Sequence, residues 1–414
     1  MAINFQVLKD TPRLLLQAKL MPLQGHRFQP TGFADLGPAR YSLPDGTEML
    51  LVESVQSVAN RMELSCWSQE DDDLIKELNG LPYIRVTKQD DSKLTNSILE
   101  AHRINSPYIL EGDDTSLIDK LKTETDSMKK APVDIRKLAK LILKYDPNAI
   151  IHGVFLAKSE LAGGRLRLPR LLSGFIEASD IRTAESGGVK NDRVDPTGDT
   201  KKGFGNVPFH RTEFVAREII SYFNLDLAQL RGYGLEECAN NLIIALSLLK
   251  IRRFLSMGLR LRTACDLDMD GELIVIKPKE GFSIPEESDL LNECSAFIGI
   301  CKEKLCFVEP AITEIKWIPH NRLIEIKLPD TVPIPEIPPD LKNDIEIKKG
   351  TGKKPPVLKF KSVLTPELSE KMQSLFWDNN EVKKAIEKAM NDQISKSGDD
   401  SDMTEENEDG GDDL

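Results

Sequence analysis

The sequence lacks the patterns that mark membrane proteins and many classes of enzyme. No apolar run approaches the roughly 20 residues of a membrane-spanning helix, and the N-terminus has neither the charge layout nor the cleavage site of a secretory signal. The chain also has no Walker A loop, no GxSxG, no HExxH and no EF-hand loop. We therefore expect a soluble cytoplasmic protein with no cofactor and no catalytic motif.

Cysteine and histidine are scarce, and neither has the spacing of a metal site. The six cysteines form no CxxC pair, and the spacings of Cys294, Cys301 and Cys306 match no common zinc motif. We interpret all six as reduced, buried thiols. His152 lies inside an apolar stretch, which predicts a core histidine with satisfied hydrogen bonds. Three other histidines each directly precede an arginine, in the pairs His26-Arg27, His102-Arg103 and His210-Arg211.

The formal net charge of −12 is concentrated at the C-terminus. Residues 397–414 hold nine acidic side chains and no basic one, so removing them leaves only −3 on the rest of the chain. A nearly neutral body can still carry a basic groove, so an acidic average does not exclude a nucleic-acid partner. The tail at 396–414 is predicted to be disordered, because it has too few apolar residues to pack.

Hydrophobic periodicity indicates an α+β fold. Alternation over 13–21 predicts a strand, and apolar residues at helical spacing predict helices over 54–67 and 236–256. The apolar stretch 149–158 is typical of a buried central strand, and 259–278 is expected to form a pair of strands. Because strands and helices do not alternate regularly, an antiparallel or mixed sheet is favoured over a Rossmann sheet.

The chain divides into a large folded body and a C-terminal extension. We place the body at 1–327, with inserted segments at about 90–131 and 184–211. A proline-rich connector at 328–362 is expected to be extended. A terminal helix is predicted over 363–395, because Thr365 and Pro366 have the residue types of an N-cap and a first helical position.

The inserted segment at 184–211 combines cations, aromatic rings and glycines. It holds Lys190, Arg193, Lys201, Lys202, Phe204, Phe209 and Arg211. Single-stranded nucleic acid needs this combination, because cations neutralise phosphates, rings stack on bases and glycines let the backbone approach. "GFGNVP" in this segment is not a dinucleotide loop, since Pro208 stands where the third glycine belongs. Composition alone leaves a solvated loop as the somewhat more favourable interpretation.

A resemblance to a known family rests on eight blocks that occur in one order between residues 27 and 267. They include "RFQPTGFADLG" (27–37), "LLVESVQSVANRME" (50–63), "LEAHRINSPYI" (99–109), "SGGVKND" (186–192) and "GNVPFHR" (205–211). The chain resembles the backbone subunit of type I-G (formerly I-U) CRISPR surveillance complexes, called Cascade, in the RAMP superfamily. The resemblance implies a modified RRM-like, ferredoxin-like core with large thumb and finger insertions.

The resemblance also implies partners. Several copies of the chain polymerise along a guide RNA (crRNA), and the guide then pairs with target DNA while the protein contacts phosphate and ribose. Other Cascade subunits and the effector helicase-nuclease complete the assembly in a prokaryotic cytoplasm. No membrane partner is implied.

Ten positions carry the RNA contacts that the resemblance implies, and none of them is catalytic. They are Arg27, Gln29, Asn60, Arg61, His102, Arg103, Lys190, Asn206, His210 and Arg211. Some relatives cut target RNA with a loop aspartate, so a metal-dependent ribonuclease acting through Asp35 or Asp192 is the alternative. A third interpretation is a protein-interaction scaffold in which the acidic tail mimics nucleic acid.

Overall fold

The computed structural model divides the chain into two compact units. The first comprises Met1–Leu110 and Thr115–Ile315, and the second comprises Glu111–Asp114 and Lys316–Leu414. The structure describes residues 3–33, 36–112, 114–257, 259–317, 325–329, 335, 337–342, 344–348, 355–360, 366–376 and 379–388. Within these ranges, no helix is both long enough and apolar enough to cross a membrane.

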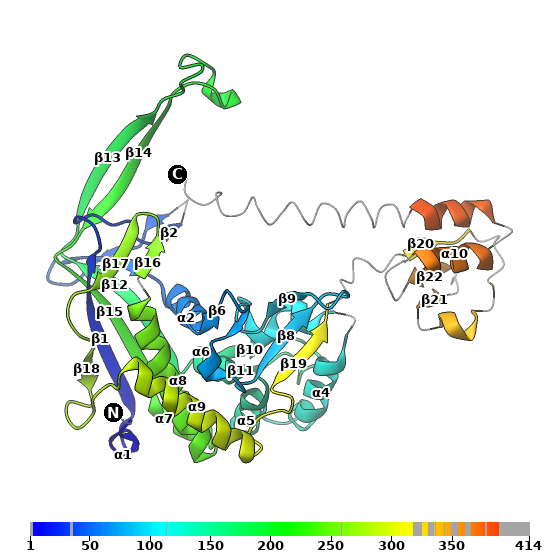
Figure 1. The fold of residues 1–414 in the computed structure, drawn as a ribbon, viewed down its shortest axis with the longest axis horizontal. Helices are drawn as coiled ribbons and strands as arrows, with labels where there is room; N and C mark the ends of the chain where they lie inside the picture. The colour runs from blue at the N-terminus through cyan, green and yellow to red at the C-terminus, as the bar shows by residue number, and fades with distance from the viewer. Residues whose placement is uncertain are drawn as a thin grey trace. The chain divides into compact units, whose positions relative to one another are not determined.

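The first unit is built on an antiparallel sheet with ferredoxin-like strand order (Figure 1). Strand β1 (Arg13–Pro22) lies between β17 (Cys265–Met269) and β15 (Glu218–Asp226), and β12 (Leu172–Ser179) pairs with the far side of β15. Numbered one to four in chain order as β1, β12, β15 and β17, these strands lie across the sheet in the order 4-1-3-2. One helix, α2 (Val55–Leu64), falls between the first and second of them, and another falls between the third and fourth. This is the βαββαβ pattern, and it confirms the α+β fold with a modified RRM/ferredoxin-like core.

Helices cover one face of this sheet because alternate residues of its strands are apolar. Leu14, Leu16 and Ala18 of β1 are buried on that face. Helix α2 begins at Ser54, whose side chain accepts a hydrogen bond from the Ser57 backbone N–H, as the periodicity over 54–67 predicted. The long helix α8 (Glu237–Ser256) packs beside α2, and α9 (Glu287–Glu303) packs on α8.

The opposite face of the sheet is only partly covered. Gln17, Tyr222 and Phe175 lie side by side across β1, β15 and β12, and all three are half-buried. The rings of Phe175 and Tyr222 stack with centroids 5.1 Å apart. Tyr41 lies nearby and donates a hydrogen bond to Glu177 at 2.6 Å. Burial is the main cause, and this hydrogen bond the second cause, of the raised pKa of Tyr41, which is about 12.

Further strands extend the sheet, and smaller elements complete the first unit. On the sheet, β5 (Glu48–Glu53) and β4 (Arg40–Ser42) follow β12 at one end, and β16 (Leu259–Arg262) follows β17 at the other; β18 (Ile274–Lys277) pairs with β1. The smaller sheets are formed by β2 (Gly32–Phe33), β3 (Gly37–Pro38), β6 (Trp67–Ser68), β7 (Asp73–Leu74), β8 (Tyr83–Thr87), β9 (Lys93–Asn96), β10 (Val154–Leu156), β11 (Leu166–Leu168) and β19 (Ile312–Lys316). The remaining helices are α1 (Phe5–Leu8), α3 (Pro107–Leu110), α4 (Ser116–Thr125), α5 (Ile135–Tyr145), α6 (Pro147–His152) and α7 (Leu227–Gly232).

The predicted central strand at 149–158 is wrong. Its first half forms helix α6, and only β10 is extended, in a small sheet with β11. The helix begins because the Asp146 carboxylate accepts hydrogen bonds from the backbone N–H groups of Asn148 (2.9 Å) and Ala149 (3.3 Å), with Pro147 at the first helical position. A short apolar run fits a buried helix as well as a buried strand, and this cap decides between them.

The second unit has its own apolar core, where a proline-rich connector was predicted. Strands β20 (Glu325–Lys327), β21 (Ile345–Lys348) and β22 (Val357–Phe360) form an antiparallel sheet. Leu358 and Phe360 are fully buried against Met372 of helix α10 (Pro366–Leu375) and its neighbours. The segment 328–362 is therefore not simply an extended connector, because its apolar residues pair and pack.

The predicted terminal helix at 363–395 is divided. Helix α10 ends at Leu375, and a second helical stretch covers 380–388. The predicted N-cap Thr365 and the predicted acidic tail at 396–414 lie outside the described residues.

Candidate nucleic-acid interface

The predicted inserted segment 184–211 lies in a long β-hairpin that projects from the main sheet (Figure 1). Strand β13 (Arg182–Lys190) pairs in antiparallel register with β14 (Val207–Val215). The two strands follow β12 and precede β15, which are neighbours in the sheet. The hairpin is therefore an outward extension of the two strands β12 and β15, and almost all of its side chains are exposed beyond its base.

One face of this hairpin collects cations around an aromatic ring. Cross-strand partners share a face, and the register pairs Ser186 with Arg211, Gly188 with Phe209, and Lys190 with Val207. A Cβ on Gly188 would come within 3.0 Å of the Phe209 ring, so the ring lies across the strand over this glycine. Lys190, Phe209 and Arg211 therefore form one surface, which we call the cationic face of the hairpin; the exposed Arg182 lies on the same face nearer the sheet.

His210 lies on the other face of the hairpin. Its cross-strand partner is Gly187, one residue out of step with the cationic face. The predicted contacts at His210 and Arg211 are consequently on opposite sides, although the two residues are adjacent in sequence.

The tip of the hairpin is held together by Asp192. Its carboxylate accepts hydrogen bonds from the backbone N–H groups of Val194 (2.8 Å), Asp195 (3.0 Å) and Gly205 (2.9 Å). These backbone bonds lower the pKa of Asp192. Its own N–H donates to Oδ1 of Asn206 at 2.8 Å. Asp192 and Asn206 therefore shape the tip, and the side-chain oxygen of Asn206, a predicted RNA contact, is engaged in this bond.

The base of the hairpin is joined to the loop that precedes β2. Phe28 and Phe214, both buried, form an isolated antiparallel bridge with N–O distances of 2.9 Å in each direction. The two residues that precede these phenylalanines form an ion pair, in which Arg27 donates to Glu213 at 2.8 Å. Just over half of the Arg27 side chain stays exposed, whereas Glu213 is mostly buried. Arg27 can therefore still present N–H groups beside the cationic face, because Glu213 lies on that face by register.

Gln29 continues the same loop and is fixed through its backbone. Its N–H donates to the Ala264 carbonyl at 2.8 Å, and its carbonyl accepts from Arg262 at 3.1 Å. Arg262 also pairs with Glu53, which is almost fully buried. The side chain of Gln29 is half-buried, so this predicted contact lies at the foot of the hairpin and not on its free part.

The predicted contacts around α2 fall into different environments. Asn60 and His102 are exposed and available to a ligand. Arg61 donates to the backbone carbonyls of Arg260, at 3.3 Å, and Leu261. Arg61 thus holds α2 to β16, and its guanidinium is occupied by the fold.

Arg103, another predicted RNA contact, lies in a buried ion pair. Arg103 forms a two-point ion pair with Glu63, with N–O distances of 2.9 and 2.6 Å, and the two side chains are only 8% and 4% exposed. Burial raises the pKa of Glu63, and the Arg103 guanidinium opposes that rise. A guanidinium enclosed in this way is a structural group, since it has no free N–H surface to offer a phosphate.

Further buried polar groups surround this ion pair. His152 is buried as predicted, but its two ring nitrogens have no hydrogen-bond partner among the described residues, and neither has Nζ of the fully buried Lys250. Burial, and then the positive charges of Lys250 and Arg103, hold the pKa of His152 well below its usual range. Burial raises the pKa of Asp146 to about 6. His152 is therefore a core histidine as predicted, but within the described residues its predicted hydrogen bonds are absent.

Among the described residues, no cluster of metal ligands forms around an aspartate of the ribonuclease alternative. Asp35 lies outside the described residues. Both carboxylate oxygens of Asp192 are engaged with backbone N–H groups. In the described part of the chain, one group of three side chains is close enough together to hold a metal, and it consists of the thiols of Cys238, Cys301 and Cys306.

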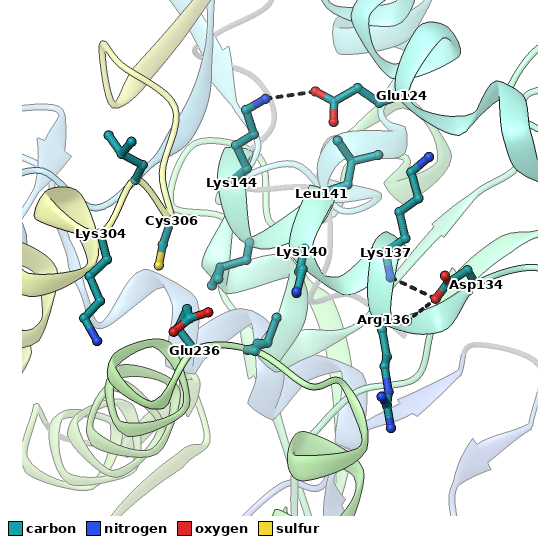
Figure 2. Close-up of a pocket in the computed structure, with 13 residues that line it drawn as sticks. Glu124, Asp134, Arg136, Lys137, Lys140, Leu141, Lys144, Glu236, Lys304 and Cys306 are labelled. Carbon is teal, nitrogen blue, oxygen red and sulfur yellow. Dashed lines mark hydrogen bonds and ion pairs between the residues drawn. The ribbon is translucent and has the colours of Figure 1, made fainter.

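A separate pocket of about 560 Å³ lies beside helix α5 (Figure 2). Arg136, Lys140 and Lys304 line it, but Glu236 does so as well, so its charge is mixed. Lys144 at its edge pairs with Glu124 at 2.9 Å, which raises the pKa of Lys144. Cys306 also lines the pocket. Nothing in this pocket matches the cation-and-ring combination of the hairpin.

Two arginines that belong to the interface were missed from the sequence. Arg182 lies on the cationic face, and Arg262 fixes the loop at its foot. Arg182 could have been found by counting alternate residues back from Lys190, once a hairpin was assumed. The Arg262–Glu53 pair spans 209 residues, so no local pattern points to it.

Comparisons with known proteins agree with the sequence blocks. Residues 14–183 match the family model described as CRISPR-associated protein GSU0053 (Cas_GSU0053). Comparison with curated proteins found no match. Among solved structures, similarity was found to a "CRISPR RNA-guided surveillance complex, pre-nicking" (12% identity, 70% of this chain and 89% of that chain, TM-score 0.33). It was also found to Csc2 of Thermofilum pendens (9% identity, 74% and 80%, TM-score 0.25).

Both structural similarities are too weak to support an argument, so the assignment depends on the family model. That match covers the chain from β1 to the start of β13, which includes the first two strands of the ferredoxin-like core and helix α2. Residues 14–183 are therefore similar to this CRISPR-associated family, which agrees with the resemblance found in the sequence.

Proposed function

We propose that the chain is a guide-RNA-binding backbone subunit of a CRISPR surveillance complex of the type I-G class. The observation that carries the proposal is the cationic face of the hairpin, where Lys190 and Arg211 flank the Phe209 ring. The family match supplies the biological setting, because it covers β1, α2 and β12 of the core from which this hairpin extends.

The arrangement suits an RNA backbone better than a base sequence. Lys190 and Arg211 are exposed and can neutralise phosphates, while the exposed Phe209 ring can stack on a base or displace one from its stack. The glycines of β13 leave room beside the ring for the ribose-phosphate chain. Arg27, Asn60, His102 and Gln29 would extend the contact along the body of the protein.

The remaining parts of the proposal follow from the family and from the sequence resemblance. Several copies would line up along one crRNA, leaving its bases free to pair with target DNA. Other Cascade subunits and the effector helicase-nuclease would be the protein partners, in the cytoplasm. The chain would bind RNA without cutting it, since Asp192 organises the hairpin tip and offers no free carboxylate to a metal.

The proposal is tested with a labelled single-stranded RNA and fluorescence anisotropy over a range of salt concentrations. Each phosphate that a cation neutralises on a single strand adds about 0.7 to the salt slope. Lys190→Ala combined with Arg211→Ala should therefore weaken binding and reduce that slope by about 1.4. The matched control is Lys88→Ala combined with Lys120→Ala, which removes two exposed cations away from the hairpin.

Equal effects in the two double variants would refute the proposal, because charge alone would then explain binding. So would a wild-type chain that ignores RNA even when it is co-expressed with its neighbouring subunits. Cleavage of a matched RNA in the presence of Mg²⁺ would overturn the non-catalytic part separately.

A further inference from the structure

Three thiols that lie far apart in the sequence meet at one point of the first unit. The sulfur atoms of Cys238, Cys301 and Cys306 all lie within 4.8 Å of one another. Cys238 and Cys301 are buried, and Cys306 is half-buried at the wall of the pocket beside α5. We propose that these three cysteines bind a thiophilic divalent cation, with zinc as the ion that fits best.

The end of helix α9 explains how two of the thiols meet. The Cys306 N–H donates to the Cys301 carbonyl at 2.9 Å, and the Leu305 N–H donates to the Lys302 carbonyl at 3.0 Å. These are the two bonds of a Schellman motif, and Leu305 has the left-handed φ of +56° that the motif requires. The motif turns the chain back so that its sixth residue faces its first. A Cys-x₄-Cys spacing at a helix end therefore brings its two side chains together.

The third thiol comes from the start of another helix. Cys238 is the second residue of α8, which packs along α9. Two elements thus converge on the site, and neither is a mobile terminus.

The geometry suits tetrahedral zinc. With Zn–S bonds of about 2.3 Å, sulfur ligands at tetrahedral corners are about 3.8 Å apart. Sulfur atoms within 4.8 Å of one another need to contract by no more than about 1 Å to reach that spacing. Thiolates select soft or borderline metals over Mg²⁺ and Ca²⁺, which require oxygen ligands.

A fourth ligand would have to come from the pocket, because among the described residues the group of ligand atoms within 4.8 Å of one another contains only the three thiols. Glu236 precedes α8 and lies next to Cys306 on the pocket wall, and Figure 2 shows its carboxylate on the side toward which the Cys306 sulfur points. The Glu236 charge also contributes to the raised pKa of Cys306, which indicates that the two groups are close. Either this carboxylate or a water from the pocket would complete the tetrahedron.

Metal binding would have to replace protons on buried sulfur. On binding, three S–H bonds would be exchanged for three Zn–S bonds, with three protons released to solvent. The ion would then join the start of α8 to the end of α9.

The experiment uses the full chain, purified under reducing conditions and stripped of metal, and titrated with Co²⁺ as a spectroscopic probe and then with Zn²⁺. We expect one Co²⁺ per chain, with sulfur-to-cobalt charge-transfer absorption that Zn²⁺ abolishes by displacement. Cys306→Ser should weaken Co²⁺ binding by tenfold or more, because even outer-shell changes cost about 10–100-fold. Cys294→Ala is the matched control, since Cys294 is buried in α9, the helix of Cys301, but lies outside the cluster.

The wild-type chain decides the matter without any variant. Absence of charge-transfer absorption at one equivalent of Co²⁺ would overturn the proposal, as would absorption that Cys294→Ala removes and Cys306→Ser leaves intact. Alkylation of the native chain is a second readout: Zn²⁺ should slow the modification of Cys306, the half-buried thiol of the cluster. The inference does not depend on RNA binding, so its failure would leave the proposed function untouched.

Discussion

The ion pair between Arg103 and Glu63 distinguishes a structural role from an RNA-binding role at a position where sequence and structure disagree. Arg103→Ala removes two charge-assisted hydrogen bonds of 2.9 and 2.6 Å and leaves the Glu63 carboxylate buried without its partner. Breaking a buried pair from one side costs about 3–5 kcal/mol. With a urea slope near the upper end of about 1–3 kcal/mol/M, the unfolding midpoint should fall by about 1 M or more.

The assay follows urea unfolding by tryptophan fluorescence, since Trp67 is buried in the same unit. His102→Ala is the matched control, because His102 is exposed and adjacent in sequence; its midpoint should move little. Arg103→Lys should fall between the wild type and Arg103→Ala, because lysine keeps the charge but cannot make the two-point contact. RNA affinity, measured well below the unfolding midpoint, should change little in Arg103→Lys.

The reverse pattern would refute this reasoning. If Arg103→Ala kept its urea midpoint within the range of the His102 control but bound RNA weakly, Arg103 would be a binding residue and the buried pair would contribute nothing measurable. A clear loss of RNA affinity in folded Arg103→Lys would likewise make Arg103 a binding residue.

Two further predictions concern the polar core and the hairpin tip. Burial depresses the native pKa of His152, so the neutral ring stabilises the fold above about pH 6.5 and that stabilisation is lost as pH falls. The loss is up to about 1.4 kcal/mol per pH unit, and His152→Leu should remove it. Urea unfolding of the wild type and of His152→Leu at pH 7.5 and 5.5 checks this prediction. The loss of stability between the two pH values should be smaller in the variant, and an equal loss would contradict the prediction. The wild type must be compared with the variant because the raised pKa of Asp146 changes stability in the opposite direction in both. Asp192→Asn breaks the bond to the Gly205 N–H, so trypsin should cut faster after Arg193. Equal cleavage rates would show that Asp192 does not hold the tip.

The sheet and its helices could be predicted because their burial is periodic. Alternation in β1 and the apolar positions of α2 and α8 are written in the local sequence, and these elements lie where the periodicity placed them. The pairing of β13 with β14 is different. Beyond the base both strands are exposed on both faces, so no alternation marks them, and the register depends on backbone bonds and on the strands that precede and follow them.

Residues of the interface were predictable in type but not in environment. Three His-Arg pairs looked equivalent in the sequence, yet Arg211 is exposed, Arg27 is half-engaged with Glu213, and Arg103 is enclosed with Glu63. The difference comes from acids that lie 40 residues away in one case and 186 in the other. Only tertiary contacts decide which cations remain free, and composition cannot report them.

The cationic face is positioned by the core, although no core residue is part of it. Strand β13 begins just after Asp180, whose φ of +50° turns the chain out of β12. Where the chain leaves β14 and rejoins the sheet, the Arg217 N–H donates a hydrogen bond to the Ser179 carbonyl at 3.1 Å. The Phe28–Phe214 bridge adds a second attachment from the loop that carries Arg27. A hairpin held at two separate points has a defined direction relative to the sheet. Each copy of the chain would therefore present its cationic face in the same direction relative to its own sheet.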